Sequence, residues 1–246
     1  TELATSSLIA PFVEELLKGC AILIVFLVFR REFDSVLDGI IYGGITALGF
    51  AATENAYYIY TYGFLKSGWT GIWSMVFIRV FLVGWQHPFY TAFTGIGLAI
   101  SRLNRSYWIK IIAPLAGFCI AFFSHSFHNI LTSILSGFSG LAIGTFIDWL
   151  GWFCLFCYFL WIIHKEKLNL QFFLLEETNL GNISPAQYKI ATSANAQSVE
   201  RFSALFKGRF KNTHRFYTLC GELAHKKNQF SRLGDEDGNL IIIKDI

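Results

Sequence analysis

The sequence predicts an all-α fold, namely a multi-pass transmembrane helical bundle followed by a short helical cytoplasmic tail. Composition is the first reason, because 54% of the 246 residues are hydrophobic and only 15% are charged, far too apolar for a soluble domain. The second reason is that five apolar runs each reach the roughly 20 helical residues that cross a hydrocarbon core. The third is the charge distribution: residues 165–246 carry 12 Lys/Arg and 9 Asp/Glu, whereas residues 1–164 carry 8 of each.

The apolar runs define a transmembrane domain over residues 1–164, with five predicted spans at about 6–29, 39–60, 71–100, 109–134 and 141–164. Lys and Arg cluster after the first, third and fifth spans. By the positive-inside rule these connections and the 165–246 tail face the cytoplasm, while the N-terminus and the loops 61–70 and 135–140 face outside. Because the sequence begins at Thr1 and not at Met, we expect further sequence upstream.

Two features predict how the spans pack. In the second span small or polar residues recur every fourth position, which lets another helix approach closely: Gly39, Gly43, Ala47, Ala51 and Asn55. In the third span Pro88 removes a backbone hydrogen bond, so we expect a kink there, with His87 beside a locally loosened helix.

A shared layer of ionisable side chains is the strongest functional signal. Counting about 1.5 Å of rise per residue from each cytoplasmic end places four of them roughly 20 to 24 Å into the membrane: Glu15, Glu54, His87 and His125. Such groups cost several kcal/mol in a bilayer unless they are paired, face a cavity or bind an ion. The layer therefore predicts a metal site.

The residue types in this layer match a catalytic zinc site. Glu54, His87 and His125 form a His₂Glu ligand set that leaves a fourth position open for water. Glu14 or Glu15 could take a proton from that water as the general base. Asn129 or His128 could donate a hydrogen bond to the oxyanion, and His128 could instead replace a ligand.

Structural readings of the same residues stay open at this stage. Glu14 and Lys18 stand four residues apart and could neutralise one another on one helix face, which would leave Glu15 for chemistry. Glu54 could be a protonated acid bonded to a neighbouring helix. Arg79 is expected to reach the outer interface or to pair with another group. Asp148 is expected to bond a neighbouring helix, to pair with Arg79, or to orient a ligand histidine.

Four motifs follow one another on successive predicted spans: Glu14-Glu15-x-x-Lys18, Phe50-x-x-x-Glu54-Asn55, His87-Pro88 with Thr91, and His125-x-x-x-Asn129. Together they resemble the PrsW family of intramembrane proteases, over roughly residues 8–135. That family is related more distantly to CAAX prenyl proteases and bacteriocin-immunity proteins, which place His where this chain has Glu54.

The resemblance implies a multi-pass peptidase of a bacterial plasma membrane that cuts membrane-anchored protein substrates near the outer face. In the family's namesake the substrate class is an anti-sigma factor. The resemblance leaves open whether zinc or only glutamate and histidine act on the water, and the His₂Glu set favours zinc.

The tail is predicted to contain two helices, at about 184–208 and 211–228. Ser184-Pro185-Ala186-Gln187 is typical of a helix start with a capping box. The expected apolar contacts are Phe202, Leu205, Phe206, Phe210, Phe216, Tyr217 and Leu219. A basic helix with aromatic residues beside a membrane is typical of an interfacial segment or a small helical cap. No motif indicates nucleic-acid binding, and the sequence does not indicate an oligomeric state.

Two other functions fit the same buried residues. The layer of carboxylates and imidazoles could relay protons or cations in a membrane transporter. The chain could also be an accessory scaffold or an immunity-type membrane protein without catalysis. Stoichiometric bound zinc favours the peptidase, whereas its absence together with pH-driven flux favours transport.

Overall fold

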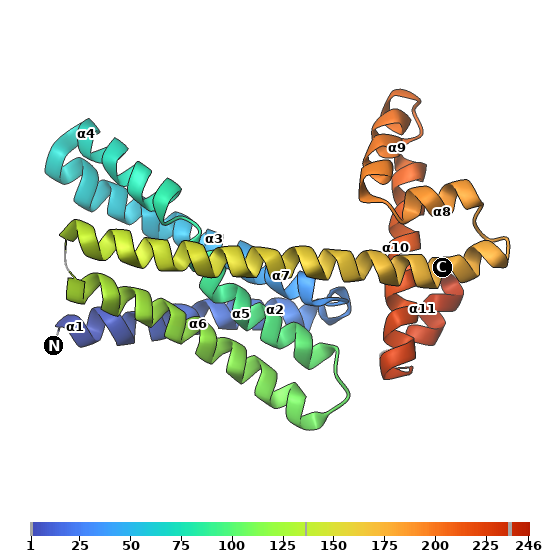
Figure 1. The fold of residues 1–246 in the computed structure, drawn as a ribbon, viewed down its shortest axis with the longest axis horizontal. Helices are drawn as coiled ribbons and strands as arrows, with labels where there is room; N and C mark the ends of the chain where they lie inside the picture. The colour runs from blue at the N-terminus through green and yellow to red at the C-terminus, as the bar shows by residue number, and fades with distance from the viewer. Residues whose placement is uncertain (1, 136, 236–237) are drawn as a thin grey trace. The chain divides into compact units, whose positions relative to one another are not determined.

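The computed structural model describes residues 2–135, 137–235 and 238–246. Within those residues every regular element is helical and no strand occurs, which confirms the predicted all-α fold class. The chain divides into two compact units, the first ending at Phe159 and the second spanning Leu160–Ile246 (Figure 1).

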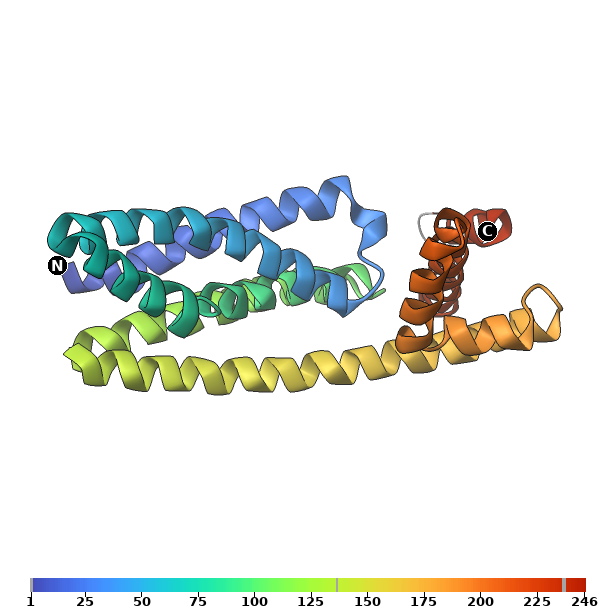
Figure 2. The same ribbon diagram turned by 90° about the horizontal axis from the view of Figure 1, so that it is seen from above.

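The first unit is built from long helices that run side by side in both views (Figures 1 and 2). In chain order its elements are α1 (Glu2–Ala4), the π-helical η1 (Thr5–Ile9), α2 (Ala10–Val28), the 3₁₀ turn η2 (Arg30–Glu32), α3 (Val36–Tyr58), the π-helical η3 (Ile59–Phe64), α4 (Leu65–Val76), the π-helical η4 (Phe77–Leu82), α5 (Gln86–Arg102), α6 (Tyr107–Leu135) and the first part of α7 (Gly137–Asn179). Within the predicted loop 135–140, Ser136 lies outside the described residues.

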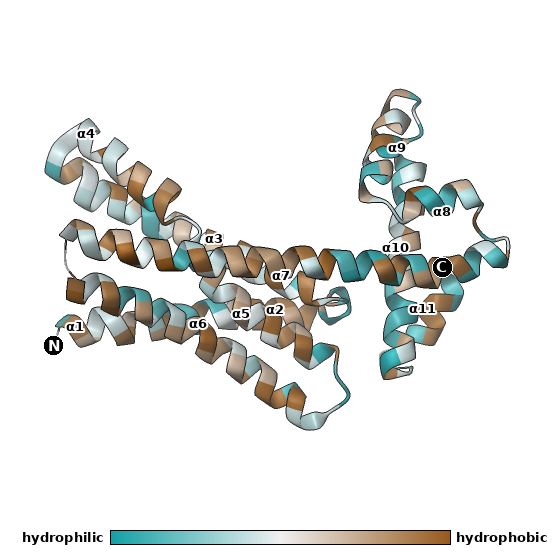
Figure 3. Ribbon diagram, in the orientation of Figure 1, coloured by the Kyte–Doolittle hydropathy of each residue, from teal (hydrophilic) through white to brown (hydrophobic). Residues whose placement is uncertain are grey.

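Three helical stretches among the described residues are long and apolar enough to cross a membrane: Val36–Arg102, Tyr107–Leu135 and Gly137–Asn179. The first contains two of the predicted spans, because the helical backbone is interrupted at Ser67 and Gly68, where the chain turns back. α2 is not among them because it carries Glu14, Glu15 and Lys18. Hydrophobic residues continue along α6 and the first part of α7 (Figure 3). Five crossings therefore remain a prediction.

The third predicted span is broken, but not at Pro88. The helix is interrupted between η4 and α5, at residues 83–85, and Pro88 lies in the first turn of α5. The missing N–H of a proline costs nothing in a first turn, because that N–H would have no partner within the helix. A Cβ on Gly84 would lie 2.2 Å from the Val80 carbonyl oxygen, so the break requires glycine there. The expected kink at Pro88 is wrong, and α5 instead begins next to His87.

The predicted stripe of small residues on α3 packs against α5. Gly39, Gly43, Ala47 and Ala51 are all buried. A Cβ on Gly39 would lie 2.3 Å from the Gly95 carbonyl oxygen, so the two backbones touch. The expectation of close helix approach is therefore confirmed.

α5 makes a second close contact, with α6. A Cβ on Gly97 would lie 2.4 Å from the Ala113 carbonyl oxygen, and one on Gly117 would lie 2.3 Å from that of Phe93. Most side chains of α5 are buried as a result. This helix is the centre of the first unit, and its residues face neighbouring helices on both sides.

The second unit contains α8 (Pro185–Ala191), α9 (Ala194–Phe206), α10 (Phe210–Leu233) and α11 (Asn239–Asp245), together with the end of α7. The predicted capping box is confirmed: Gln187 N donates to Ser184 Oγ at 3.3 Å, and Ser184 N donates to Gln187 Oε1 at 2.8 Å. The single helix expected over 184–208 is wrong. α8 ends at Ala191, and the Ser193 hydroxyl accepts from Ala196 N at 3.3 Å to start α9.

The core of the second unit consists of Leu174, Ile183, Ala191, Tyr217, Cys220 and Ala224. Two of the residues expected to make apolar contacts, Tyr217 and Phe216, belong to this core or pack against it. The side chains of Phe202, Leu205 and Phe206 are 64%, 55% and 75% exposed, and the Phe202 and Phe206 rings contact each other with centroids 5.0 Å apart. α9 turns Ala204 inward instead, because a small side chain allows a closer approach to the rest of the unit.

The contact between Gly39 and Gly95 can be tested by adding one methyl group. In Gly95→Ala the new Cβ would stand 1.9 Å from the Gly39 carbonyl oxygen, so the helices must separate. Overpacking of this kind costs about 1–3 kcal/mol. We expect a lower thermal unfolding midpoint for the full chain in detergent micelles.

Gly44→Ala is the matched control, because a Cβ there meets no heavy atom within 4 Å. That variant should match the parent or gain up to about 1 kcal/mol from helix propensity. Equal midpoints for Gly95→Ala and Gly44→Ala would contradict the backbone contact.

Candidate functional site

Glu15 lies at the centre of the buried polar cluster in the first unit. Its side chain is fully buried, and Lys18 Nζ lies 2.6 Å from its Oε1. The Thr91 hydroxyl of α5 donates to its Oε2 at 2.8 Å. The ion pair expected between Glu14 and Lys18 is therefore wrong, because Lys18 lies three residues from Glu15 and turns to that carboxylate.

His125 of α6 is held by the same carboxylate. Its Nδ1 lies 2.9 Å from Glu15 Oε1, and its ring stacks on Tyr90 with centroids 5.0 Å apart. A carboxylate accepts hydrogen bonds, so Nδ1 carries the proton and Nε2 keeps a free lone pair. A carboxylate behind an imidazole is also the usual support of a histidine metal ligand.

His87 is held at both of its ring nitrogens. Lys18 Nζ lies 3.2 Å from Nδ1, and Glu54 Oε2 lies 3.0 Å from Nε2. A lysine ammonium can only donate, so Nδ1 accepts and Nε2–H donates to Glu54. The rings of His87 and His125 lie 5.2 Å apart at 81°, so two imidazoles from different helices meet at one point.

Glu54 of α3 pairs with Arg79. The guanidinium Nη2 lies 2.6 Å from Glu54 Oε2, and its Nε donates to Asn55 Oδ1 at 2.9 Å. The guanidinium also lies 4.2 Å from the centre of the Tyr58 ring. Arg79 thus pairs with another group, which was one of its two expected roles. Its pairing with Asp148, by contrast, is wrong.

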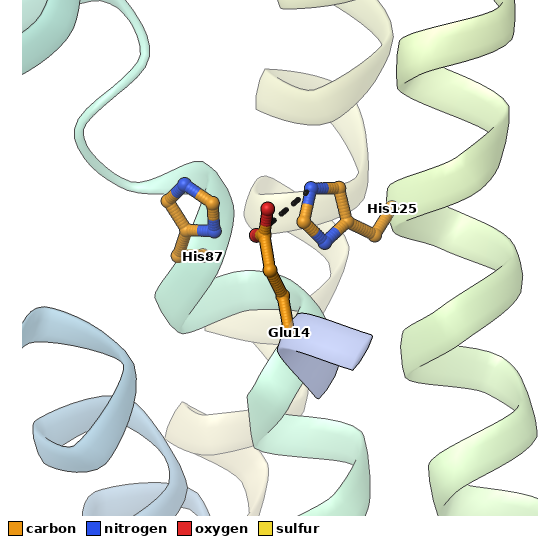
Figure 4. Close-up of side chains that lie close together, drawn as sticks. All are labelled: Glu14, His87 and His125. Atoms are coloured by element: carbon orange, nitrogen blue, oxygen red, sulfur yellow. Dashed lines mark ion pairs between the residues drawn. The ribbon is translucent and has the colours of Figure 1, made fainter. Parts of the chain in front are cut away.

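Glu14 points into the space between the two imidazoles (Figure 4). Its Oε2 lies 3.8 Å from His125 Nε2, too far for a hydrogen bond, and this buried oxygen has no hydrogen-bond partner. One ligand atom each of Glu14, His87 and His125 lies within 4.8 Å of the others. A buried carboxylate oxygen without a donor beside two imidazoles fits a bound cation.

Asp148 of α7 bonds neighbouring helices, as expected. Its Oδ2 lies 2.5 Å from His128 Nδ1 and accepts from Gln86 Nε2 at 2.6 Å. Asn129, one turn after His125, donates to the Ser6 carbonyl at 2.9 Å. Sequence reasoning missed Gln86, and the available signal was an amide next to His87 in an apolar run.

A cavity joins these side chains. Its lining includes every predicted site residue except Glu15, and consists of Ser6, Ala10, Glu14, Glu54, Tyr58, Arg79, Gln86, His87, Tyr90, His125, His128, Asn129, Thr132 and Ser133. Glu15 is covered by Lys18, Thr91 and His125. Of the expected ligand set, His87 and His125 belong to the compact group, and Glu14 takes the third place there instead of Glu54.

Comparison with known proteins supports the family that the sequence motifs indicate. The sequence model of the PrsW family, described as "PrsW family intramembrane metalloprotease", matches residues 1–162. Protease PrsW of Oceanobacillus iheyensis is 28% identical over 119 residues, which are 48% of this chain and 49% of that protein. The match thus spans about half the length of this curated relative. No solved structure matches the chain. Since the family match covers well over half of the chain, the chain belongs to the PrsW family of intramembrane metalloproteases.

Proposed function

We propose that this chain is a zinc-dependent intramembrane peptidase that hydrolyses peptide bonds of membrane-anchored proteins. The observation that carries the proposal is the convergence of Glu14, His87 and His125 on one cavity, the two histidines coming from helical stretches apolar enough to cross a membrane. We further propose a bacterial plasma membrane as its location, with the C-terminus in the cytoplasm. The curated relative is named as a protease, which supports a peptide bond as the reacting group.

Glu14, His87 and His125 would hold the metal ion. Two imidazoles and one carboxylate are a standard ligand set of catalytic zinc sites. Zinc bound there would acidify water and polarise the peptide carbonyl. Binding through His87 Nε2 would require the tautomer with the proton on Nδ1, so this nitrogen would no longer accept from Lys18 and Nε2 would no longer donate to Glu54.

Glu15 is proposed to position His125 and not to touch the substrate. Its Oε1 fixes the ring through Nδ1, which directs Nε2 away from Glu15. Thr91 and Lys18 hold the carboxylate in turn. Glu15 is absent from the cavity lining, which supports a positioning role over proton transfer from water.

Glu54 is proposed as the proton acceptor. It is the other carboxylate among the described residues that line the cavity, and its Oε2 faces His87. It would take a proton from the attacking water and deliver it to the departing amine. This proposal exchanges the roles that the sequence suggested for Glu14 and Glu54.

Asn129 is the better placed of the two expected oxyanion donors. Its amide uses one N–H on Ser6 and keeps a second. His128 directs Nδ1 at Asp148, which leaves Nε2 of the neutral ring as an acceptor. We therefore assign the hydrogen bond to the carbonyl oxygen to Asn129.

The cavity extends from Glu14 towards one end of the bundle. Ser6 and Ala10 line it at the start of the chain, and Thr132 and Ser133 line it near the end of α6. Under the predicted orientation these ends face outside. We propose that an unfolded, extended segment of the substrate enters from that side, and that regulators resembling anti-sigma factors are the substrate class.

Metal content tests His125 as a ligand. His125→Ala removes one of three protein ligands, so purified protein should lose most of its bound zinc and its peptidase activity. His214→Ala, in α10 of the second unit, is the control and should keep both. Full zinc occupancy in His125→Ala, measured by elemental analysis after dialysis, would exclude this residue as a ligand.

The roles of the two cavity carboxylates are separated by a pair of isosteric variants. Glu14→Gln should lose both zinc and activity, because an amide is a poor replacement for a carboxylate ligand. Glu54→Gln should keep zinc and lose activity by at least about 100-fold, the usual scale of general-base catalysis. Zinc loss in Glu54→Gln with retention in Glu14→Gln would restore the assignment that the sequence suggested.

The Glu15–Lys18 pair can be tested by a double-mutant cycle. Both side chains are buried, so Glu15→Gln or Lys18→Met alone leaves an uncompensated charge and should cost about 3–5 kcal/mol of unfolding free energy. The double variant removes both charges and should recover a large part of the loss. Additive effects in detergent micelles would show that the pair is not coupled.

A further inference from the structure

We propose that the corner between α9 and α10 is a membrane-binding surface for anionic phospholipid. The corner consists of Val199, Phe202, Leu205, Phe206 and Phe210, whose exposed fractions are 69%, 64%, 55%, 75% and 40%. The proposal does not depend on the peptidase site, because all of these residues belong to the second unit.

Helical spacing places these side chains together. Val199, Phe202 and Phe206 recur at intervals of three and four residues, so they share one face of α9. The Phe202 and Phe206 rings are in contact, with centroids 5.0 Å apart. Ala204 on the opposite side is fully buried. The aromatic face is therefore outside the core of its own unit.

A tight turn joins this face to the start of α10. Gly208 has φ +65°, a backbone conformation that favours glycine, and α10 begins two residues later at Phe210. Phe206 and Phe210 thus flank one short connection. Exposed aromatic side chains on both sides of a tight turn can enter an interface without unfolding the helices.

The basic side chains around the corner indicate an anionic partner. Residues 199–215 contain five basic side chains and one acid, Glu200; the basic side chains are Arg201, Lys207, Arg209, Lys211 and Arg215. Four of them, from Lys207 onwards, are exposed. A leaflet of anionic phospholipid offers acyl chains for the aromatic rings and phosphates for the cations. The positive charge and the apolar side chains of the corner both match such a leaflet.

Chain connectivity links this corner to a helix that is long and apolar enough to span a membrane. α7 contains an apolar stretch of membrane-spanning length, and α8 with two short connections separates its end at Asn179 from α9. An anionic leaflet is therefore an apolar phase that the tail of a PrsW-family chain can reach. Contact with it would hold α9 at the lipid surface.

Depth-dependent quenching tests the proposal in the full chain. A fluorophore would be attached to Phe206→Cys, and separately to Phe202→Cys, in a background with the native cysteines replaced by alanine. The protein is reconstituted in vesicles of phosphatidylcholine with or without phosphatidylglycerol, each containing acyl chains brominated at a known depth. We expect quenching with phosphatidylglycerol, and none at Asn195→Cys, an exposed control at the polar start of α9.

Charge-reversal variants provide a second test of the proposal. Each of Lys207→Glu, Arg209→Glu and Lys211→Glu should lower the equilibrium constant for membrane contact at least about fivefold, because loss of one basic residue near an anionic leaflet costs about 1 kcal/mol and the new acid adds repulsion. Hydrogen exchange of the chain with its native cysteines gives an independent measurement. Amides of 199–211 should exchange more slowly with phosphatidylglycerol present, and amides of α8 should not change.

Three results would overturn the proposal. The first is quenching that is equal with and without phosphatidylglycerol and unaffected by charge reversal. The second is the absence of both quenching and hydrogen-exchange protection. The third is protection that depends on protein concentration and comes with energy transfer between labelled copies, which would identify the corner as an interface between two copies of this chain.

Discussion

The buried ion pair between Glu15 and Lys18 is the interaction on which the rest of the site depends. Glu15 contacts Lys18, Thr91 and His125 at once, and Lys18 also contacts His87. Residues from α2, α5 and α6 are thus tied to one carboxylate. A charge buried in an apolar bundle is tolerated only with such partners, so these contacts are mutually required.

The same constraint explains why a divalent cation suits this cluster. Its described members include four carboxylates, Glu14, Glu15, Glu54 and Asp148, and two basic side chains that pair with them, Lys18 and Arg79. With ionised carboxylates and neutral histidines, two negative charges remain. Lysine or arginine pairs with Glu15 and Glu54, and Asp148 accepts from Gln86 and contacts His128, whereas Glu14 Oε2 lacks a hydrogen-bond donor. A zinc ion there would balance the charge and satisfy this oxygen together.

Sequence predicts the participants of this site well, because burying an ionisable group in a membrane leaves few alternatives. Matched depth identified Glu15, Glu54, His87 and His125, and the structure brings these four together. The stripe of small residues likewise predicted a close helix contact, though not that α5 would be the partner. The all-α fold followed from composition and apolar length.

Pairing within the site could not be predicted from the sequence. Lys18 is within reach of both Glu14 and Glu15 on an ideal helix, and tertiary contacts decide which it meets. The break before α5 was missed for a related reason. Pro88 is a visible signal, whereas the need for glycine at position 84 comes from the Val80 carbonyl that folding brings near it. In the tail, apolar contacts were expected for Phe202 and Phe206, but an apolar helical face alone does not show what covers it, and both side chains are largely exposed.

Two adjacent acids in one helix divide their tasks by geometry. Consecutive residues on an α-helix point about 100° apart, so Glu14 and Glu15 cannot both face the same neighbour. Glu15 faces α5 and α6, whose Thr91 and His125 hold it together with Lys18 of its own helix. Glu14 consequently faces the cavity. One carboxylate thus fixes His125 from behind, and the other stands in front of its Nε2. A single acid at either position could not both orient this imidazole and share a metal ion with it, which gives a physical reason for the pair.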